Sequence, residues 1–237
     1  MKILFAVVLA AVASSTNYQI ESDSLNFGGV LSTSPNYRLE DTLGEIATGN
    51  SSSASYKIKA GYRAMLGFSI SISAPSNLTL SAITSLPSGR SEGSVAWTVI
   101  TDNDAGYTLA IKAATNPALK SGSGSDNFVD YSPGGNVPDY IWSVEANASE
   151  FGFSPEGADV ASSYLDNGST CGAGSSETAN RCWNGFSTTN KIIASRASNN
   201  TPSGTVTTVK LQAEVTAGRA QTVGNYSAAL TATALAQ

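Results

Sequence analysis

Short runs in which apolar and polar residues alternate fill most of the sequence after residue 63, and this pattern restricts the fold more than any other feature. Side chains two residues apart share a face of a β-strand, whereas a helix needs apolar residues three and four positions apart. Turn-forming Pro, Gly, Asn and Asp separate the runs. We therefore predict an all-β protein, an antiparallel β-sandwich over 63–237. The clearest runs are 66–72, 78–80, 95–99, 107–111, 206–211 and 226–230.

A long irregular segment at about 117–190 interrupts this rhythm. It is rich in Gly, Ser and Asn, and one stretch at 158–165 has the pattern of a short helix. Connections of this length are uncommon in compact domains and usually either carry function or lack order. Within this segment, we predict that residues 140–186 form a structured insertion at one end of the sandwich and hold the recognition surface of the protein.

The first 13 residues have the pattern of a secretory signal peptide. Lys2 supplies a positive charge, an apolar run follows at 3–12, and small residues at 11–13 form a cleavage site. A membrane anchor is the alternative, but the run is short for a bilayer and polar residues follow it at once. We predict cleavage, secretion or display on the extracellular surface, and no transmembrane segment in the mature chain.

Two cysteines, Cys171 and Cys182, lie within the irregular segment. In an exported chain they are expected to form a disulfide, because the compartments that such chains enter are oxidising. Two reduced thiols or a partial metal site are the alternative, although no histidine and no third cysteine is present to complete zinc ligation. The pair would fasten one local loop.

Between residues 14 and 62 the sequence repeats itself. Tyr18, Tyr37 and Tyr56 follow one another at intervals of 19 residues, and an aliphatic residue stands two positions after each. The tyrosine and the aliphatic residue would share one face of a strand. We predict paired, half-buried strands that pack on the sandwich or on a neighbouring subunit, because three short repeats are too few to stand alone.

The composition argues against nucleic acid as a partner. Only 13% of the residues are charged, compared with about 25% in average globular proteins, and the net charge is −5. A negative surface repels phosphate backbones. The surface is expected to be polar without being strongly ionic.

The chain contains no histidine. This excludes Ser-His-Asp and Cys-His catalysis and every histidine-based zinc site. Residues 89–93 match the G-x-S-x-G pattern of a nucleophile elbow, but that motif needs a strand-to-helix turn and a base, so we interpret it as a surface turn. We expect neither enzymatic activity nor a cofactor.

Carboxylates are the remaining groups suited to acid–base catalysis or to metal binding. Five of them lie near aromatic residues of the irregular segment, and two carboxylates are sufficient for glycoside hydrolysis. A solvated acidic loop is the alternative interpretation. Asp102 and Asp104 are candidates for a calcium site, with capping of a turn as the alternative, because their spacing matches no complete loop of oxygen ligands. The five carboxylates are Glu145, Glu150, Glu156, Asp159 and Asp166.

Aromatic residues of the irregular segment are the candidates for ligand binding. Trp183 directly follows Cys182 and Phe186 lies three residues further on, so a disulfide would hold this loop in place. Tyr140 and Trp142 lie earlier in the same segment. An ordered ring with a polar atom at its edge is a suitable platform for a ligand. Burial beneath the loop is the alternative for Trp183.

Several short motifs have counterparts in other proteins. S-P-N-Y-R-L at 34–39 and S-A-S-Y-K-I at 53–58 resemble N-terminal segments of uncharacterised exported bacterial proteins. W-T-V-I-T-D-N at 97–103, G-Y-T-L at 106–109 and G-N-Y-S-A at 224–228 resemble strand pairs of bacterial cell-surface β-sandwiches, and are distantly similar to WxL-type and pilin-like modules. The resemblance implies a surface location and a structural or adhesive role.

These observations favour an exported, non-enzymatic structural or adhesion protein of the cell surface. Its expected partners are a surface polymer, a glycan or like subunits. A carbohydrate-binding module that presents Trp183 and Phe186 is the first alternative. A histidine-free glycosidase that uses two of the five carboxylates is the second.

Overall fold

The computed structural model describes residues 31–34, 38–40, 49–52, 57–60, 67–73, 75–84, 88–123, 126–135 and 138–237. The signal peptide expected at 1–13 and the three tyrosines of the repeat lie outside these residues. The chain divides into two compact units, Met1–Phe68 and Ser69–Gln237, and each is described by itself.

In the first unit the described strands form two short antiparallel pairs. β1 (Leu31–Thr33) pairs with β2 (Arg38–Glu40), and β3 (Gly49–Ser52) pairs with β4 (Lys57–Ala60). Isolated two-stranded ribbons of this length are marginal in water. The 19-residue repeat and the packing of these strands on another unit or subunit stay predictions.

The larger sheet of the second unit has the strand order β11-β10-β13-β6-β5, and neighbouring strands run antiparallel. β13 and β6 keep one register from the pair Thr205 and Val99 to the pair Val215 and Gly89. A short β9 runs parallel to β10, so this sheet is mixed. The strands are β5 (Ile70–Ile72), β6 (Gly89–Thr101), β9 (Val129–Asp130), β10 (Ser149–Glu156), β11 (Asn184–Gly185) and β13 (Thr205–Val215).

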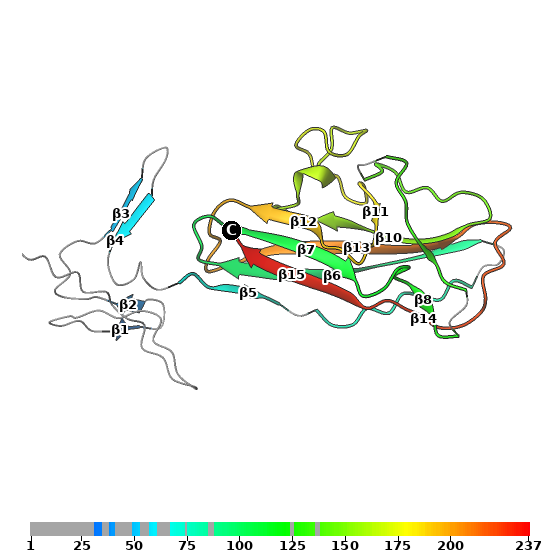
Figure 1. Cartoon of the computed structure of the whole chain (residues 1–237), viewed down its shortest axis with the longest axis horizontal. Coiled ribbons are helices and arrows are strands. Elements are labelled where there is room, and N and C mark those ends of the chain that lie inside the picture. Colours follow the sequence, from blue (N-terminus) through cyan, green and yellow to red (C-terminus); the bar gives the residue numbers. More distant parts are fainter. Residues whose placement is uncertain are drawn as a thin grey trace, which may run out of the picture. The chain divides into compact units, whose positions relative to one another are not determined.

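The second sheet of this unit has the order β12-β7-β15 and is antiparallel (Figure 1). A bulge interrupts β12 between Ile192 and Ala194. A separate small pair joins β8 to β14. The strands are β7 (Tyr107–Ala113), β8 (Lys120–Ser121), β12 (Lys191–Arg196), β14 (Tyr226–Ser227) and β15 (Leu230–Ala236).

One cluster of buried side chains draws on both sheets. In the second half of β6 the buried side chains alternate with more exposed ones, as a period of two requires. In β7 the small Ala110 is buried as well, between Leu109 and Ile111. Full burial of one such side chain contributes about 1.5 to 3 kcal/mol. The all-β fold predicted from the alternation is confirmed. The most deeply buried large residues are Val99, Tyr107, Leu109, Ile111, Phe153, Ile193 and Val209.

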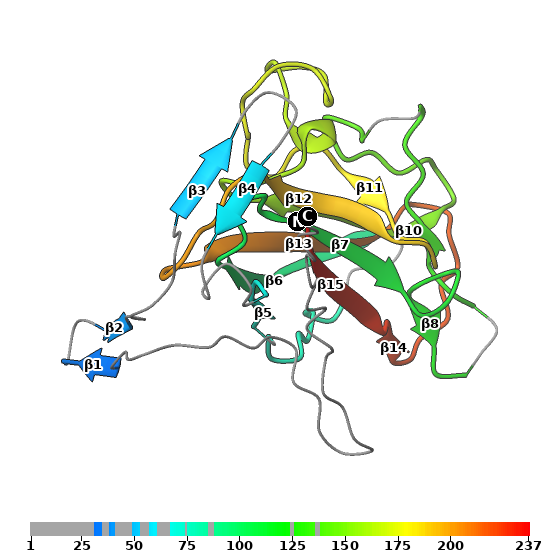
Figure 2. The ribbon, with the colours of Figure 1, turned by 60° about the vertical axis from the view of Figure 1, so that its left-hand side comes forward.

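The irregular segment at 117–190 contributes three strands, β9, β10 and β11, to the larger sheet. β10 lies between β13 and β11, and its Phe151 and Phe153 belong to the buried cluster. The helix expected at 158–165 is one 3₁₀ turn, η1 (Ser162–Tyr164). Figures 1 and 2 show the chain around η1 standing out beside β11 and β12. The segment is therefore part sheet and part projecting loop.

No helix among the described residues is long and apolar enough to cross a membrane.

Candidate recognition surface

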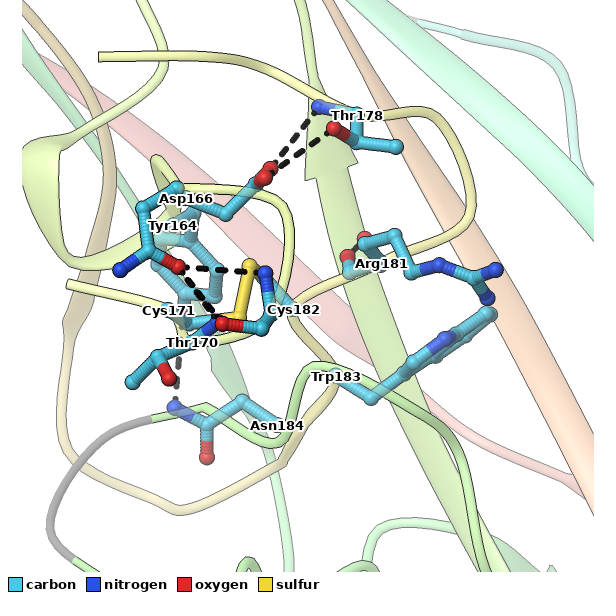
Figure 3. The surroundings of a disulfide bond; sticks show 12 residues. Tyr164, Asp166, Thr170, Cys171, Thr178, Arg181, Cys182, Trp183 and Asn184 are labelled. Carbon is cyan, nitrogen blue, oxygen red and sulfur yellow. Dashed lines mark hydrogen bonds between the residues drawn. A yellow bond between two sulfur atoms is a disulfide. The ribbon is translucent and has the colours of Figure 1, made fainter. Parts of the chain in front are cut away.

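The disulfide predicted between Cys171 and Cys182 is confirmed. Their Cα atoms lie 5.6 Å apart, and both residues are buried. Figure 3 shows the side chains of Arg181 and Trp183 pointing away from the disulfide. The bond therefore fixes the chain segment just before β11, from which these two side chains project.

A buried carboxylate orders the same loop from within. Asp166 is fully buried and accepts hydrogen bonds from the backbone N–H of Gly168 at 2.7 Å and from both the N–H and the hydroxyl of Thr178 at 3.1 Å. These bonds offset the unfavourable burial of a charge. Asp166 and the disulfide together hold residues 166–182 without a large apolar core.

The loop packs on the outer face of β10. Phe151 and Phe153 point into the core, so Gly152 and Ser154 face outward, and both are buried. The hydroxyl of Ser154 donates to the carbonyl of Arg181. A Cβ at position 152 would lie only 2.7 Å from the Tyr131 Cβ. Glycine at this position lets aromatic side chains rest directly on the strand.

Those side chains, Tyr131, Trp142 and Trp183, form what we term the aromatic cluster. The Tyr131 and Trp142 rings stack with centroids 4.2 Å apart, and Trp183 meets Trp142 edge-on at 5.2 Å. The Trp142 indole N–H donates to Glu214 of β13 at 2.7 Å, and that of Trp183 donates to the Asn180 carbonyl at 3.2 Å. Aromatic pairs in these geometries add stability beyond burial alone.

The expectation that Trp183 and Phe186 present free rings is corrected by their burial. Each is 4% exposed. Phe186 belongs to the core, where it stacks on Phe151 with centroids 5.1 Å apart. For Trp183 the alternative of burial beneath the loop holds. Tyr140 and Trp142 stay partly exposed, and the Arg181 guanidinium lies 5.2 Å above the Tyr140 ring.

A shallow depression of about 130 Å³ lies next to the aromatic cluster, and we call it the β6–β13 depression. Glu92 and Ser94 come from outward positions of β6, and Lys210 comes from β13 directly opposite Ser94. Sequence reasoning missed these residues because only the strand register brings them together. The lining is Glu92, Gly93, Ser94, Asn180, Trp183, Lys210 and Leu211.

Negative charges gather at the other end of the same face. Glu150 of β10 lies opposite Glu214 of β13. Burial raises the pKa of Glu150 above its usual 4.5, and the nearby charges of Glu145, Asp139 and Glu214 raise it further. Directly opposed like charges on one sheet face destabilise it.

We predict that Glu150→Gln stabilises the protein at neutral pH by up to about 1 kcal/mol, the size of an unfavourable cross-strand pair on a partly solvated face. Because the folded state raises the pKa of Glu150, stability falls as pH rises through that pKa. The gain should therefore vanish below the ordinary pKa of 4.5. Urea unfolding of both proteins at several pH values measures this difference in the free energy of unfolding.

Glu145→Gln is the control, because Glu145 is exposed, and it should change stability less than Glu150→Gln does. A loss of stability in Glu150→Gln at neutral pH would contradict the expected repulsion.

The five carboxylates proposed for glycoside hydrolysis serve different parts of the fold. Glu156 accepts from the backbone of Asn180 at 2.8 Å, and Asp159 pairs with Arg196 at 3.1 Å while accepting from the Tyr107 hydroxyl at 2.9 Å. Asp166 orders the disulfide loop as described. Glu150 and Glu145 remain close enough for their charges to repel each other.

Asp102 and Asp104 flank the turn between β6 and β7. Asp102 accepts from the backbone of Ser69 at 2.6 Å, and Asp104 accepts from the Asn199 side chain at 3.0 Å. Their carboxylates thus hold chain segments together at this turn. Within the part of the chain that the structure describes, no group of three or more Cys, Asp or Glu side chains is placed to hold a metal ion.

Comparison of the chain with protein-family models, curated proteins and solved structures finds no match.

Proposed function

We propose that this chain is an exported, non-enzymatic adhesion or structural protein of the cell surface, and that it binds a neutral surface carbohydrate through the β6–β13 depression. The observation that carries the proposal is the loop at 166–183. A disulfide and a buried carboxylate hold it against the outer face of the larger sheet, where it completes the wall of the depression. Ordering a binding loop in advance reduces the entropy lost on binding.

The disulfide also supports the extracellular location, since such bonds persist in oxidising compartments.

The chemistry of the depression favours a polyol. Glu92 accepts hydrogen bonds and Lys210 donates them, so together they suit the hydroxyl groups of a sugar, each of which both donates and accepts. The volume of about 130 Å³ is well below the roughly 300 to 1,000 Å³ of sites for drug-sized molecules. A single sugar ring of a polymer is an occupant of the right size.

We also infer that the two sheets stack as a sandwich. The support is the single buried cluster to which β6, β10 and β13 of one sheet and β7 and β12 of the other contribute. In a sandwich the inner faces share one core, and an outer face remains for recognition. The β6–β13 depression lies on such an outward face.

The experiment that tests the function is binding of the purified mature chain to a glycan array and to isolated cell-wall polysaccharide. Lys210→Ala is expected to weaken binding about tenfold, the effect of losing one charged hydrogen bond. Lys112→Ala, on an outward position of β7 in the other sheet, is the matched control and should bind as the parent does.

Two outcomes would contradict the proposal. If the parent chain binds no glycan or wall polymer, or if Lys112→Ala weakens binding as much as Lys210→Ala does, the depression is not the site. Turnover of a chromogenic glycoside by the parent chain would show that the protein is an enzyme. Glu150 and Glu145 would then be the candidate catalytic carboxylates.

A further inference from the structure

Lys191 places its amine directly against a side-chain amide. The Nζ atom lies 2.8 Å from the Asn184 Oδ1 and 2.7 Å from the Gly185 carbonyl oxygen. Lys191 begins β12 and Asn184 begins β11, so the two strands belong to different sheets. Lys191 makes no ion pair with any other described residue. A half-buried amine with only neutral acceptors is poorly compensated as a cation.

An acid lies near the same amine. Asp130 of β9 accepts from the backbone of Ala118 at 2.9 Å through Oδ1, while its Oδ2 is buried without a hydrogen-bond partner among the described residues. Burial raises the pKa of Asp130 and lowers that of Lys191, and the mutual attraction of the two groups opposes both shifts only in part. Both shifts favour the neutral amine and the neutral acid.

Hydrogen bonds at both its oxygen and its nitrogen hold the Asn184 amide in place. Its Oδ1 accepts a second hydrogen bond from the Gly185 N–H at 2.8 Å, and its Nδ2 donates to the Tyr164 hydroxyl at 3.4 Å. A backbone N–H that already points at the oxygen can stabilise negative charge developing there. Gly185 and Tyr164 are buried, so the amide lies at the edge of the core.

We propose that Lys191 and Asn184 form an intramolecular isopeptide bond. The Nζ lone pair attacks the Asn184 Cγ, and the Gly185 N–H stabilises the oxyanion. The Cγ–Nδ2 bond then breaks as the Cγ–Nζ amide forms, and the Nδ2 nitrogen leaves as ammonia with the proton released from Nζ. Asp130 carries that proton between the two nitrogens, as a general acid and base. Holding both groups in contact replaces a slow bimolecular reaction by an intramolecular one.

The product would join β11, an edge strand of the larger sheet, to β12, an edge strand of the other. It would lie close in sequence to Cys182 and would give this side of the protein a second covalent link that reductants do not open.

Mass spectrometry of tryptic peptides tests the proposal directly. In the parent chain we expect trypsin not to cut after Lys191, and a peptide spanning 182–196 to be lighter than its sequence by one ammonia molecule. Lys191→Arg keeps the charge but should give the full mass and cleavage after residue 191. Asp130→Asn should slow or abolish the loss of ammonia. Lys112→Arg is the control and should retain it.

Cleavage after Lys191 in the parent chain, with the full peptide mass, would overturn the proposal. So would a loss of ammonia that persists in Lys191→Arg, since a succinimide formed between Asn184 and Gly185 releases ammonia without the lysine. Both readouts come from the parent chain or from a charge-conserving variant, so poor folding of Asp130→Asn does not affect the decision.

Discussion

Trp183→Ala is expected to lower the free energy of unfolding by about 3 to 5 kcal/mol, the usual effect of removing a buried aromatic ring. The ring is 4% exposed and contacts Trp142 with ring centroids 5.2 Å apart. Its removal leaves a cavity and takes away the N–H donor that the Asn180 carbonyl uses. Since domains are stable by only about 5 to 15 kcal/mol, this is a large fraction of the total. Urea denaturation followed by tryptophan fluorescence measures it.

Ile141→Ala is the matched control in the same segment. Ile141 is 61% exposed, so its truncation should change stability by no more than about 0.5 kcal/mol. The opposite pattern is informative. If Trp183→Ala unfolds like the parent chain but no longer binds a wall polymer, Trp183 acts at the surface and its packing role is wrong.

Replacing both Cys171 and Cys182 by serine is expected to lower the free energy of unfolding by about 2 to 3 kcal/mol. The cysteines are 11 residues apart in sequence, and opening a loop of this size restores about that much conformational entropy to the unfolded chain. The midpoint of thermal unfolding should fall accordingly. Binding to a wall polymer should weaken as well, since residues 166–183 would lose their preformed arrangement.

Treatment with a reductant is the control for the double replacement of Cys171 and Cys182. It should lower the melting temperature of the parent chain toward that of the double variant and leave the double variant unchanged. A parent chain whose melting temperature does not respond to reductant, while the disulfide is demonstrably reduced, would mean that Asp166 and its hydrogen bonds hold the loop alone.

The β class and the disulfide could be predicted from the sequence because both depend on local signals. The alternating apolar residues of 97–99 and 107–111 are buried, as a strand with a period of two requires. The two cysteines have only each other to pair with in this sequence. Neither inference needs to know which strand lies beside which.

The identity of β10 and the start of β6 could not be predicted in this way. β10 carries Gly152, Ser154 and Pro155, which are poor strand formers. The loop covers the outward positions Gly152 and Ser154, and pairing with β13 extends over all three residues. Residues 89–93, interpreted as a surface turn, form the start of β6, where eleven consecutive pairs with β13 override the glycines. The β6–β13 depression depends on the same long-range pairing.

The pairing of β6 with β13 has a consequence for the order in which the chain folds. β6 ends at Thr101, whereas its partner begins at Thr205, and β15, which completes the other sheet, ends at Ala236. Folds dominated by such distant pairings form slowly, because a long loop must close before the contacts repay its entropy. The complete core therefore cannot assemble until synthesis has passed Ala236. Until then β6 and β7 lack these partners, although β5 can already pair with β6.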